Sequence, residues 1–108
     1  MKQFLSASAL ALAVMAPVTL APVAAMAGPV ETACNRSERQ GANRQLCRCI
    51  EAAADRTLTR SEQRRAARFF ANPDEAQEVR MSPSRGDNEF WARYRAFGAQ
   101  AEQMCQGL

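Results

Sequence analysis

Apolar residues recur at helical spacing in four stretches of the chain, and nowhere do apolar and polar residues alternate with period two. The spacing predicts helices over residues 44–57, 60–71, 73–81 and 87–106, and it predicts no β-strand. The polar stretch 28–43 has room for one short helix ending at Gly41. We therefore expect an all-α fold, a small bundle of about four short helices around one core.

Residues that favour helix ends mark three of these boundaries. Asn43 can cap the helix that begins at residue 44. Thr59 and Glu62 form a capping box, in which each side chain bonds a backbone N–H at the start of the next helix. Pro73 suits the first position of a third helix, because proline has no N–H to leave unsatisfied there.

The last predicted helix follows a turn over residues 82–86, with Asp87 or Asn88 as its cap. We interpret its aromatic residues as core, because a small bundle needs their volume. Its apolar stripe consists of Phe90, Tyr94, Phe97, Ala101 and Met104, with Trp91 and Cys105 at the edge. The helix over 44–57 carries the stripe Leu46, Ile50 and Ala53, with Cys47 and Cys49 on opposite flanks. These two helices hold three of the four cysteines, so we expect them to lie side by side.

The first 27 residues have the layout of a secretory signal peptide: Lys2, an apolar run over 4–25, and small residues before Gly28. A membrane anchor is the alternative, but polar residues and prolines interrupt the run and no basic cluster follows it. We expect cleavage near Ala27/Gly28. The product would be a periplasmic or secreted domain of residues 28–108 with no membrane span.

Four cysteines in an exported chain of this size indicate disulfides rather than a zinc site. Cys47 and Cys49 lie two residues apart in a predicted helix, where side chains point about 200° apart, so they cannot bridge each other. Two pairings remain: Cys34–Cys47 with Cys49–Cys105, or Cys34–Cys49 with Cys47–Cys105. Loop entropy does not distinguish them, and the first is our preference.

The chain contains no histidine, which excludes histidine-based acid–base catalysis, Ser-His-Asp triads and c-type haem attachment. We expect no catalytic residue, no metal and no cofactor. Lys2 is the only lysine, so residues 28–108 carry 13 arginines against 11 acidic residues, a balance too weak to favour nucleic acid. Glu51 and Asp55 are interpreted as surface carboxylates paired with Arg44 and Arg48.

The helix over 60–71 carries an arginine ridge. Arg60, Arg64 and Arg68 recur at every fourth position with Arg65 beside them, and the opposite face is apolar. One interpretation is a contact surface for an acidic protein or an anionic envelope component. The other is a solvated face, partly neutralised by Glu62 and Asp55.

Segments 47–50, 61–70, 72–73 and 90–94 resemble a group of short exported, four-cysteine helical proteins from alphaproteobacteria. The resemblance covers residues 34–105, and it implies a bacterial host and an oxidising compartment without supplying catalytic residues. Some members carry the label "arginine transporter", but a domain of 81 residues without a spanning segment cannot form a permeation path. We expect a non-enzymatic interaction module. The alternatives are an inhibitor or acid-stress chaperone, or an accessory to arginine transport.

Overall fold

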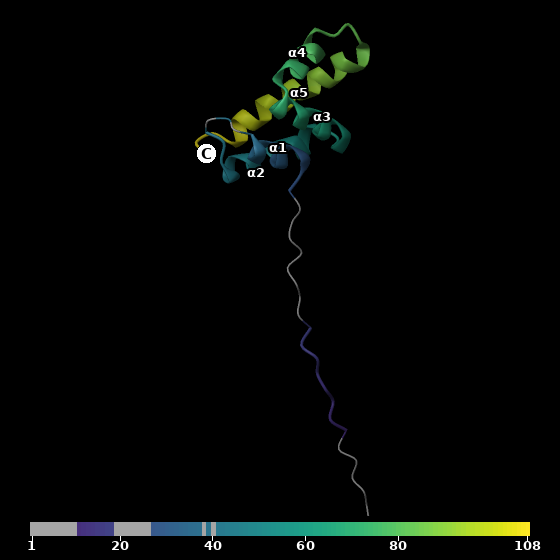
Figure 1. The fold of residues 1–108 in the computed structure, drawn as a ribbon, viewed down its shortest axis with the longest axis vertical. Helices are drawn as coiled ribbons and strands as arrows, with labels where there is room; N and C mark the ends of the chain where they lie inside the picture. The colour runs from purple at the N-terminus through teal and green to yellow at the C-terminus, as the bar shows by residue number, and fades with distance from the viewer. Residues whose placement is uncertain (1–10, 19–26, 38, 40) are drawn as a thin grey trace, which may run out of the picture.

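The computed structural model describes residues 11–18, 27–37, 39 and 41–108, and within them the fold is all-α. Figure 1 shows the helices gathered in one body, with residues 11–18 extending away from it. The helices are α1 (Pro29–Arg36), α2 (Arg44–Thr57), α3 (Arg60–Ala71), α4 (Pro73–Met81) and α5 (Arg85–Met104). The predicted fold class and the helices over 44–57, 60–71 and 73–81 are therefore confirmed.

The predicted caps of the middle helices are also confirmed. The Asn43 side chain accepts a hydrogen bond from the Leu46 N–H at 2.8 Å. Thr59 and Glu62 form the reciprocal capping box of α3, and Pro73 is the first residue of α4. These short-range signals fix where the chain changes direction.

Three boundaries differ from the prediction. The short helix α1 ends at Arg36 rather than at Gly41. The last helix begins at Arg85, because the Ser84 hydroxyl accepts the Asp87 N–H at 3.2 Å and so acts as the cap in place of Asp87 or Asn88. Gly86, expected in a turn, lies in the first turn of α5, and the helix ends at Met104.

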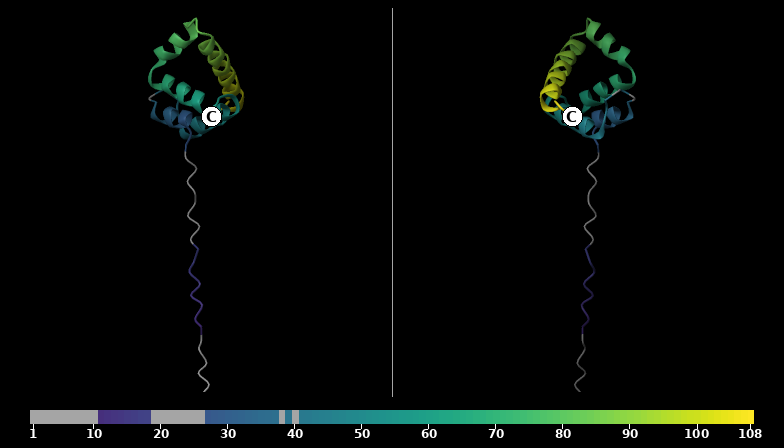
Figure 2. Two further views of the ribbon diagram at one scale, coloured as in Figure 1. Left: turned by 90° about the vertical axis from the view of Figure 1, so that its right-hand side faces the viewer. Right: turned by 90° about the vertical axis from the view of Figure 1, so that its left-hand side faces the viewer.

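The most extensive contacts among the five helices form a closed ring, in which each helix packs mainly against two others, and side chains of α3 also reach α5. Around the ring, α2 contacts α1, α1 contacts α3, α3 contacts α4, α4 contacts α5, and α5 returns to α2. Figure 2 shows this arrangement from two sides. The expected neighbourhood of α2 and α5 is therefore confirmed.

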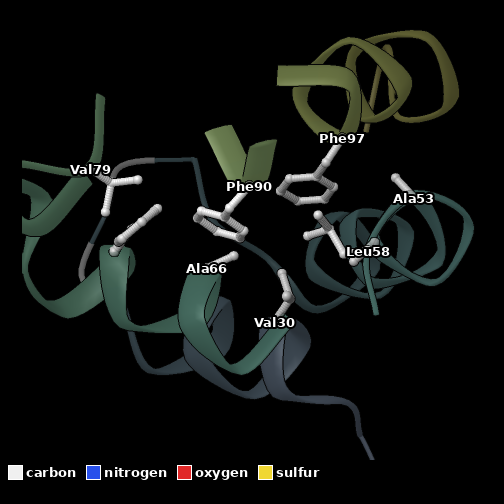
Figure 3. Close-up of a cluster of buried hydrophobic side chains, with 9 residues drawn as sticks. Val30, Ala53, Leu58, Ala66, Val79, Phe90 and Phe97 are labelled. Carbon is white, nitrogen blue, oxygen red and sulfur yellow. The ribbon is translucent and has the colours of Figure 1, made fainter. Parts of the chain in front are cut away.

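The core inside the ring is small. Its nine buried apolar residues include three alanines, and the remaining volume comes mainly from aromatic side chains (Figure 3). Tyr94 lies among these rings, 5.2 Å from Phe69 in a T-shaped pair and 5.1 Å from Trp91 between centroids. Burial raises the pKa of Tyr94. Trp91 and Tyr94 pack against the core, as their interpretation as core residues requires.

The buried face of α2 is turned relative to the predicted stripe. Ala53 of the stripe is buried as predicted, and so are Cys47, Glu51 and Ala54. Leu46 and Ile50 of the stripe are only half-buried. The reason is that α2 must face both α1 and α5, so two flanks of the helix are covered instead of one.

All four cysteines are in disulfides, which lie on opposite flanks of α2. Cys34 on α1 bonds Cys47, with 5.5 Å between their Cα atoms. Cys49 bonds Cys105 after α5, with 5.8 Å between Cα atoms. This is the first of the two pairings that the sequence left open, and it ties α2 to both of its neighbours in the ring.

Most of the predicted signal peptide, residues 1–10 and 19–26, lies outside the described residues. Of the described part, Leu12, Val14, Met15 and Val18 are each at least 86% exposed. No helix in the described part of the chain combines the length and apolar character that a membrane span requires.

Removing either disulfide should destabilise the fold, and the longer loop should matter more. In the chain-entropy treatment, the 13-residue loop of Cys34–Cys47 contributes about 3 kcal/mol and the 56-residue loop of Cys49–Cys105 about 4 kcal/mol. Urea unfolding of the two double Cys→Ala variants measures these losses. Unfolding midpoints unchanged in both variants would contradict a stabilising role.

Candidate anion-binding groove

The helix α3 separates its arginines from its core residues. Ala66 and Phe69 are buried, whereas Arg60, Arg64 and Arg68 are exposed. Residues four apart lie on one face of a helix, which explains why these three side chains form a single ridge. The ridge borders α1, the neighbour of α3 in the ring.

A groove of about 610 Å³ runs between α1 and α3, with this ridge along one side. Both walls are helical stripes of residues three or four apart. Together with Ala27, the groove is lined by Pro29, Thr32, Ala33 and Arg36 of α1 and by Arg60, Arg64, Ala67 and Arg68 of α3. Four arginines therefore surround a floor of small, mostly apolar side chains.

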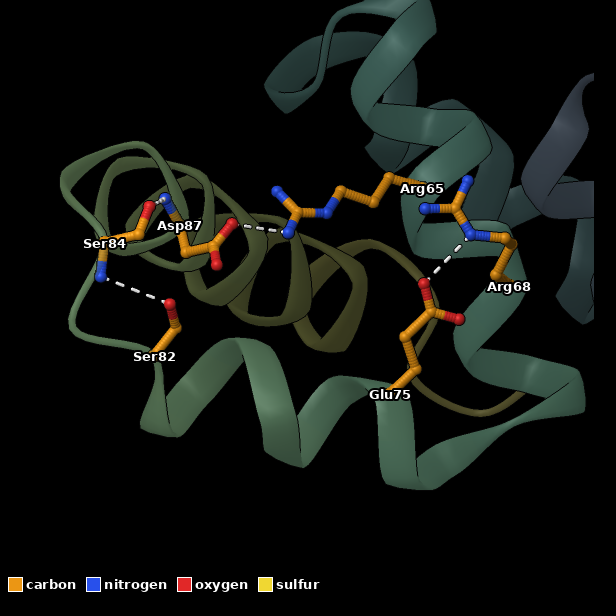
Figure 4. Close-up of polar contacts among 6 residues, drawn as sticks. All are labelled: Arg65, Arg68, Glu75, Ser82, Ser84 and Asp87. Atoms are coloured by element: carbon orange, nitrogen blue, oxygen red, sulfur yellow. Dashed lines mark hydrogen bonds and ion pairs between the residues drawn. The ribbon is translucent and has the colours of Figure 1, made fainter.

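Two of the groove arginines are partly neutralised within the protein. The Arg68 Nε donates a hydrogen bond to Glu75 at 2.9 Å (Figure 4). Arg60 Nη1 lies 3.9 Å from Glu51 Oε1, close enough for attraction but too far for a hydrogen bond. Among the described residues, no carboxylate lies within 4 Å of Arg36 or Arg64. The groove therefore has an excess of positive charge.

Arg65, which the sequence placed with the ridge, serves the fold instead. It points toward α5, where it pairs with Asp87 (Figure 4). Its guanidinium group also lies over the Phe90 ring, 4.6 Å from the centroid. The hydrogen bond from Arg65 lowers the pKa of Asp87. A position one residue from Arg64 points about 100° away around the helix, which turns Arg65 out of the groove.

The predicted neutralising acids also lie elsewhere. Glu62 pairs with Arg93 of α5, and Asp55 accepts a hydrogen bond from Gln63 at 3.1 Å. Burial disfavours ionisation of Glu62, but the hydrogen bonds from the Thr59 N–H and Arg93 outweigh it, so the pKa of Glu62 is lowered. Neither acid pairs with the ridge.

The interpretation of Glu51 as a surface carboxylate paired with Arg44 and Arg48 is wrong. Glu51 is only 6% exposed, and its Oε2 accepts the N–H groups of Val30 and Glu31 at 3.0 and 3.1 Å. It lies on the flank of α2 that α1 covers, and it satisfies orphan donors at the start of α1. Burial raises the pKa of Glu51, and the N–H donors oppose that effect.

A second hollow of about 630 Å³ lies beside the α2–α3 connection, lined by Asp55, Glu62 and Arg93 among others. The charges of Glu62 and Arg93 neutralise each other there. Within the described ranges, no group of three or more acidic residues or cysteines is placed to hold a metal ion. The α1–α3 groove is thus the better candidate site, and its chemistry is anion binding by guanidinium groups.

No protein-family model matches this chain, and neither the curated proteins nor the solved structures include a detectable relative. The function must therefore be inferred from the groove itself.

Sequence reasoning missed Arg36 and the floor of the groove. The ridge on α3 follows from its own periodicity, whereas the contribution of α1 depends on how two helices pack. No local signal in residues 28–43 indicates that α1 lies beside α3.

Arg65 and Arg64 should respond differently to substitution. Arg65→Ala removes the stacking on Phe90 and should destabilise the fold by about 1 kcal/mol. Arg64→Ala, at an exposed position, should change stability by less than about 0.5 kcal/mol. Urea unfolding of both variants tests this, and equal losses would show that Arg65 has no special structural role.

Proposed function

We propose that this protein is a non-enzymatic, exported interaction module whose α1–α3 groove binds an acidic segment of a partner protein. The observation that carries the proposal is the set of four groove arginines, of which Arg36 and Arg64 have no carboxylate partner among the described residues. Unpaired guanidinium groups around a concave surface are suited to bidentate contacts with carboxylates.

The shape of the groove favours a peptide over a membrane surface. A lipid headgroup layer is broad and engages exposed faces, whereas this arginine set lines a groove of about 610 Å³ between two helices. Pro29, Ala33 and Ala67 leave room for apolar side chains between the charges. An extended segment with alternating acidic and small apolar residues would match both features.

The excess positive charge also bears on arginine transport. A groove surrounded by guanidinium groups repels an arginine molecule, because like charges at short range are unfavourable. No observation in the described residues favours an accessory role in arginine transport. We propose instead that the positive charge selects an anionic partner.

We further propose a periplasmic or secreted location after removal of residues 1–27. Disulfides persist in oxidising compartments, and both are present here. The exposed apolar residues at 12, 14, 15 and 18 do not pack on the helices, and in a mature protein they would favour aggregation. The resemblance to short exported alphaproteobacterial proteins supports the same location.

Binding to the groove can be tested with a fluorescent peptide of alternating glutamate and alanine. Arg36→Ser/Arg64→Ser should weaken binding roughly tenfold, because two charge-assisted contacts are lost. Neither arginine has an ion pair with a described carboxylate, so the fold should be unaffected. The affinity of the native protein should fall as salt is added.

The matched control is Arg80→Ser/Arg95→Ser, which removes the same net charge from exposed positions outside the groove. It should bind as the native protein does. If both double variants bound the peptide equally weakly, the loss of binding would be due to the lower net charge and not to the groove. Stronger groove-dependent binding to phosphatidylglycerol vesicles or an anionic polysaccharide than to the peptide would contradict a peptide partner.

A further inference from the structure

Glu51 has one carboxylate oxygen that is satisfied and one that is not. Oε2 accepts two backbone N–H groups from the first turn of α1. Oε1 is buried, and among the described residues it has no hydrogen-bond donor. Its nearest cation, Arg60 Nη1, lies 3.9 Å away. A buried carboxylate oxygen without a donor is costly, which points to a missing positive group.

Gly28 lies directly against this oxygen. A Cβ atom built on Gly28 would overlap both Oε1 and Cδ of Glu51. Because the backbone nitrogen and a Cβ atom share the same Cα, the Gly28 nitrogen lies within about 4 Å of Oε1. The φ of Gly28 is −69°, which any residue can adopt. Glycine is therefore required here because a side chain would not fit, and not because of the backbone conformation.

The other donors at the start of α1 are already used. Pro29 has no N–H, Glu51 accepts from Val30 and Glu31, and the Thr32 N–H bonds the Gly28 carbonyl at 3.0 Å. The nitrogen of Gly28, just before these residues, is therefore the nearest backbone nitrogen left to donate to Glu51 Oε1. It is also the atom that becomes an α-amino group if cleavage occurs after Ala27.

We propose that cleavage between Ala27 and Gly28 creates an ammonium group that pairs with Glu51 Oε1 and completes the anchoring of α1. The proposal rests on the cleavage site that the sequence predicts, and it does not depend on what the groove binds. Removal of the signal peptide would then stabilise the fold, so that the protein reaches full stability only after export.

The surrounding charges leave room for this extra cation. The polar pocket of about 260 Å³ around Gly28 and Glu51 is also lined by Glu31 of α1, Arg48 and Asp55 of α2, and Arg60 of α3. The negative charges of Glu31 and Asp55 balance the positive charges of Arg48 and Arg60, so the negative charge of Glu51 has no counterpart among the pocket residues. An ammonium group beside Glu51 neutralises it and favours the ionised carboxylate.

The absence of lysine after residue 2 makes this α-amine the only amine in the cleaved chain, so amine reagents modify it alone. The full-length chain can be exported by a bacterial host and the processed protein purified from the periplasm, with its first residue identified by mass spectrometry. Reductive ¹³C-dimethylation keeps the positive charge of the amine, whereas acetylation removes it. The two products form a matched pair.

In the dimethylated protein, ¹³C NMR should show an amine pKa at least about one unit above its value in the unfolded chain, because a carboxylate at this range favours the charged form. Glu51→Gln should remove that shift. The acetylated protein should melt at a lower temperature than the dimethylated one at neutral pH.

The stabilisation of the fold by this ion pair should depend on pH through the ionisation of the amine and of Glu51. An amine whose pKa is higher in the folded protein than in the unfolded chain stabilises the fold fully at pH values below the unfolded pKa. That stabilisation is lost as the pH rises through the higher, folded-state pKa. On the acid side, the contribution is lost as Glu51 becomes protonated. The difference in melting temperature between the two modified proteins should therefore be largest near neutral pH and shrink in both directions.

An amine that titrates as in the unfolded chain, with equal melting of the two products, would overturn the proposal. A processed chain that begins at a residue other than Gly28 would overturn it as well. Should Glu51→Gln not fold, the comparison of the two modified native proteins decides. Arg36→Ser/Arg64→Ser should keep the amine shift even if it shows no loss of binding, so the two proposals fail separately.

Discussion

Two disulfides leave opposite flanks of α2, and the arrangement of the other helices depends on them. Through Cys47 the helix holds α1, and through Cys49 it holds the C-terminal end of α5. The enclosed core contains three alanines among nine buried apolar residues, so hydrophobic burial supplies little on its own. Cross-links that restrict the unfolded chain compensate for a core of this size.

The groove is a consequence of how α1 is held. A helix of eight residues is not stable alone, and α1 is fixed by the disulfide at Cys34, by burial of Val30 and by the carboxylate of Glu51. These contacts place Arg36 and the small residues of α1 beside the arginines of α3. The protein uses some of its arginines to join helices, as Arg65 does, and leaves others facing the groove.

Much of the fold could be predicted from local signals. Asn43, the Thr59–Glu62 capping box and Pro73 are short-range features whose physics does not depend on the rest of the chain, and each lies where the sequence placed it. The start of the last helix was misplaced because Ser84, and not Asp87, acts as its N-cap.

What could not be predicted depends on contacts between helices. Glu51 has the sequence pattern of a surface residue, and only the packing of α1 against α2 shows that its partners are the backbone of residues 30 and 31. The same contact determines the position of Gly28. The separation of Arg65 from the groove likewise requires the position of Phe90 on α5, which no spacing within α3 reveals.

Non-reducing peptide mapping of the exported protein tests the central role of α2 most directly. Trypsin cleaves after Arg48 and so separates Cys47 from Cys49. The structure predicts that the peptide ending at Arg36 is linked to peptide 45–48, and that peptide 49–56 is linked to peptide 96–108. A link between the peptide ending at Arg36 and peptide 49–56, or free thiols in the native protein, would contradict it.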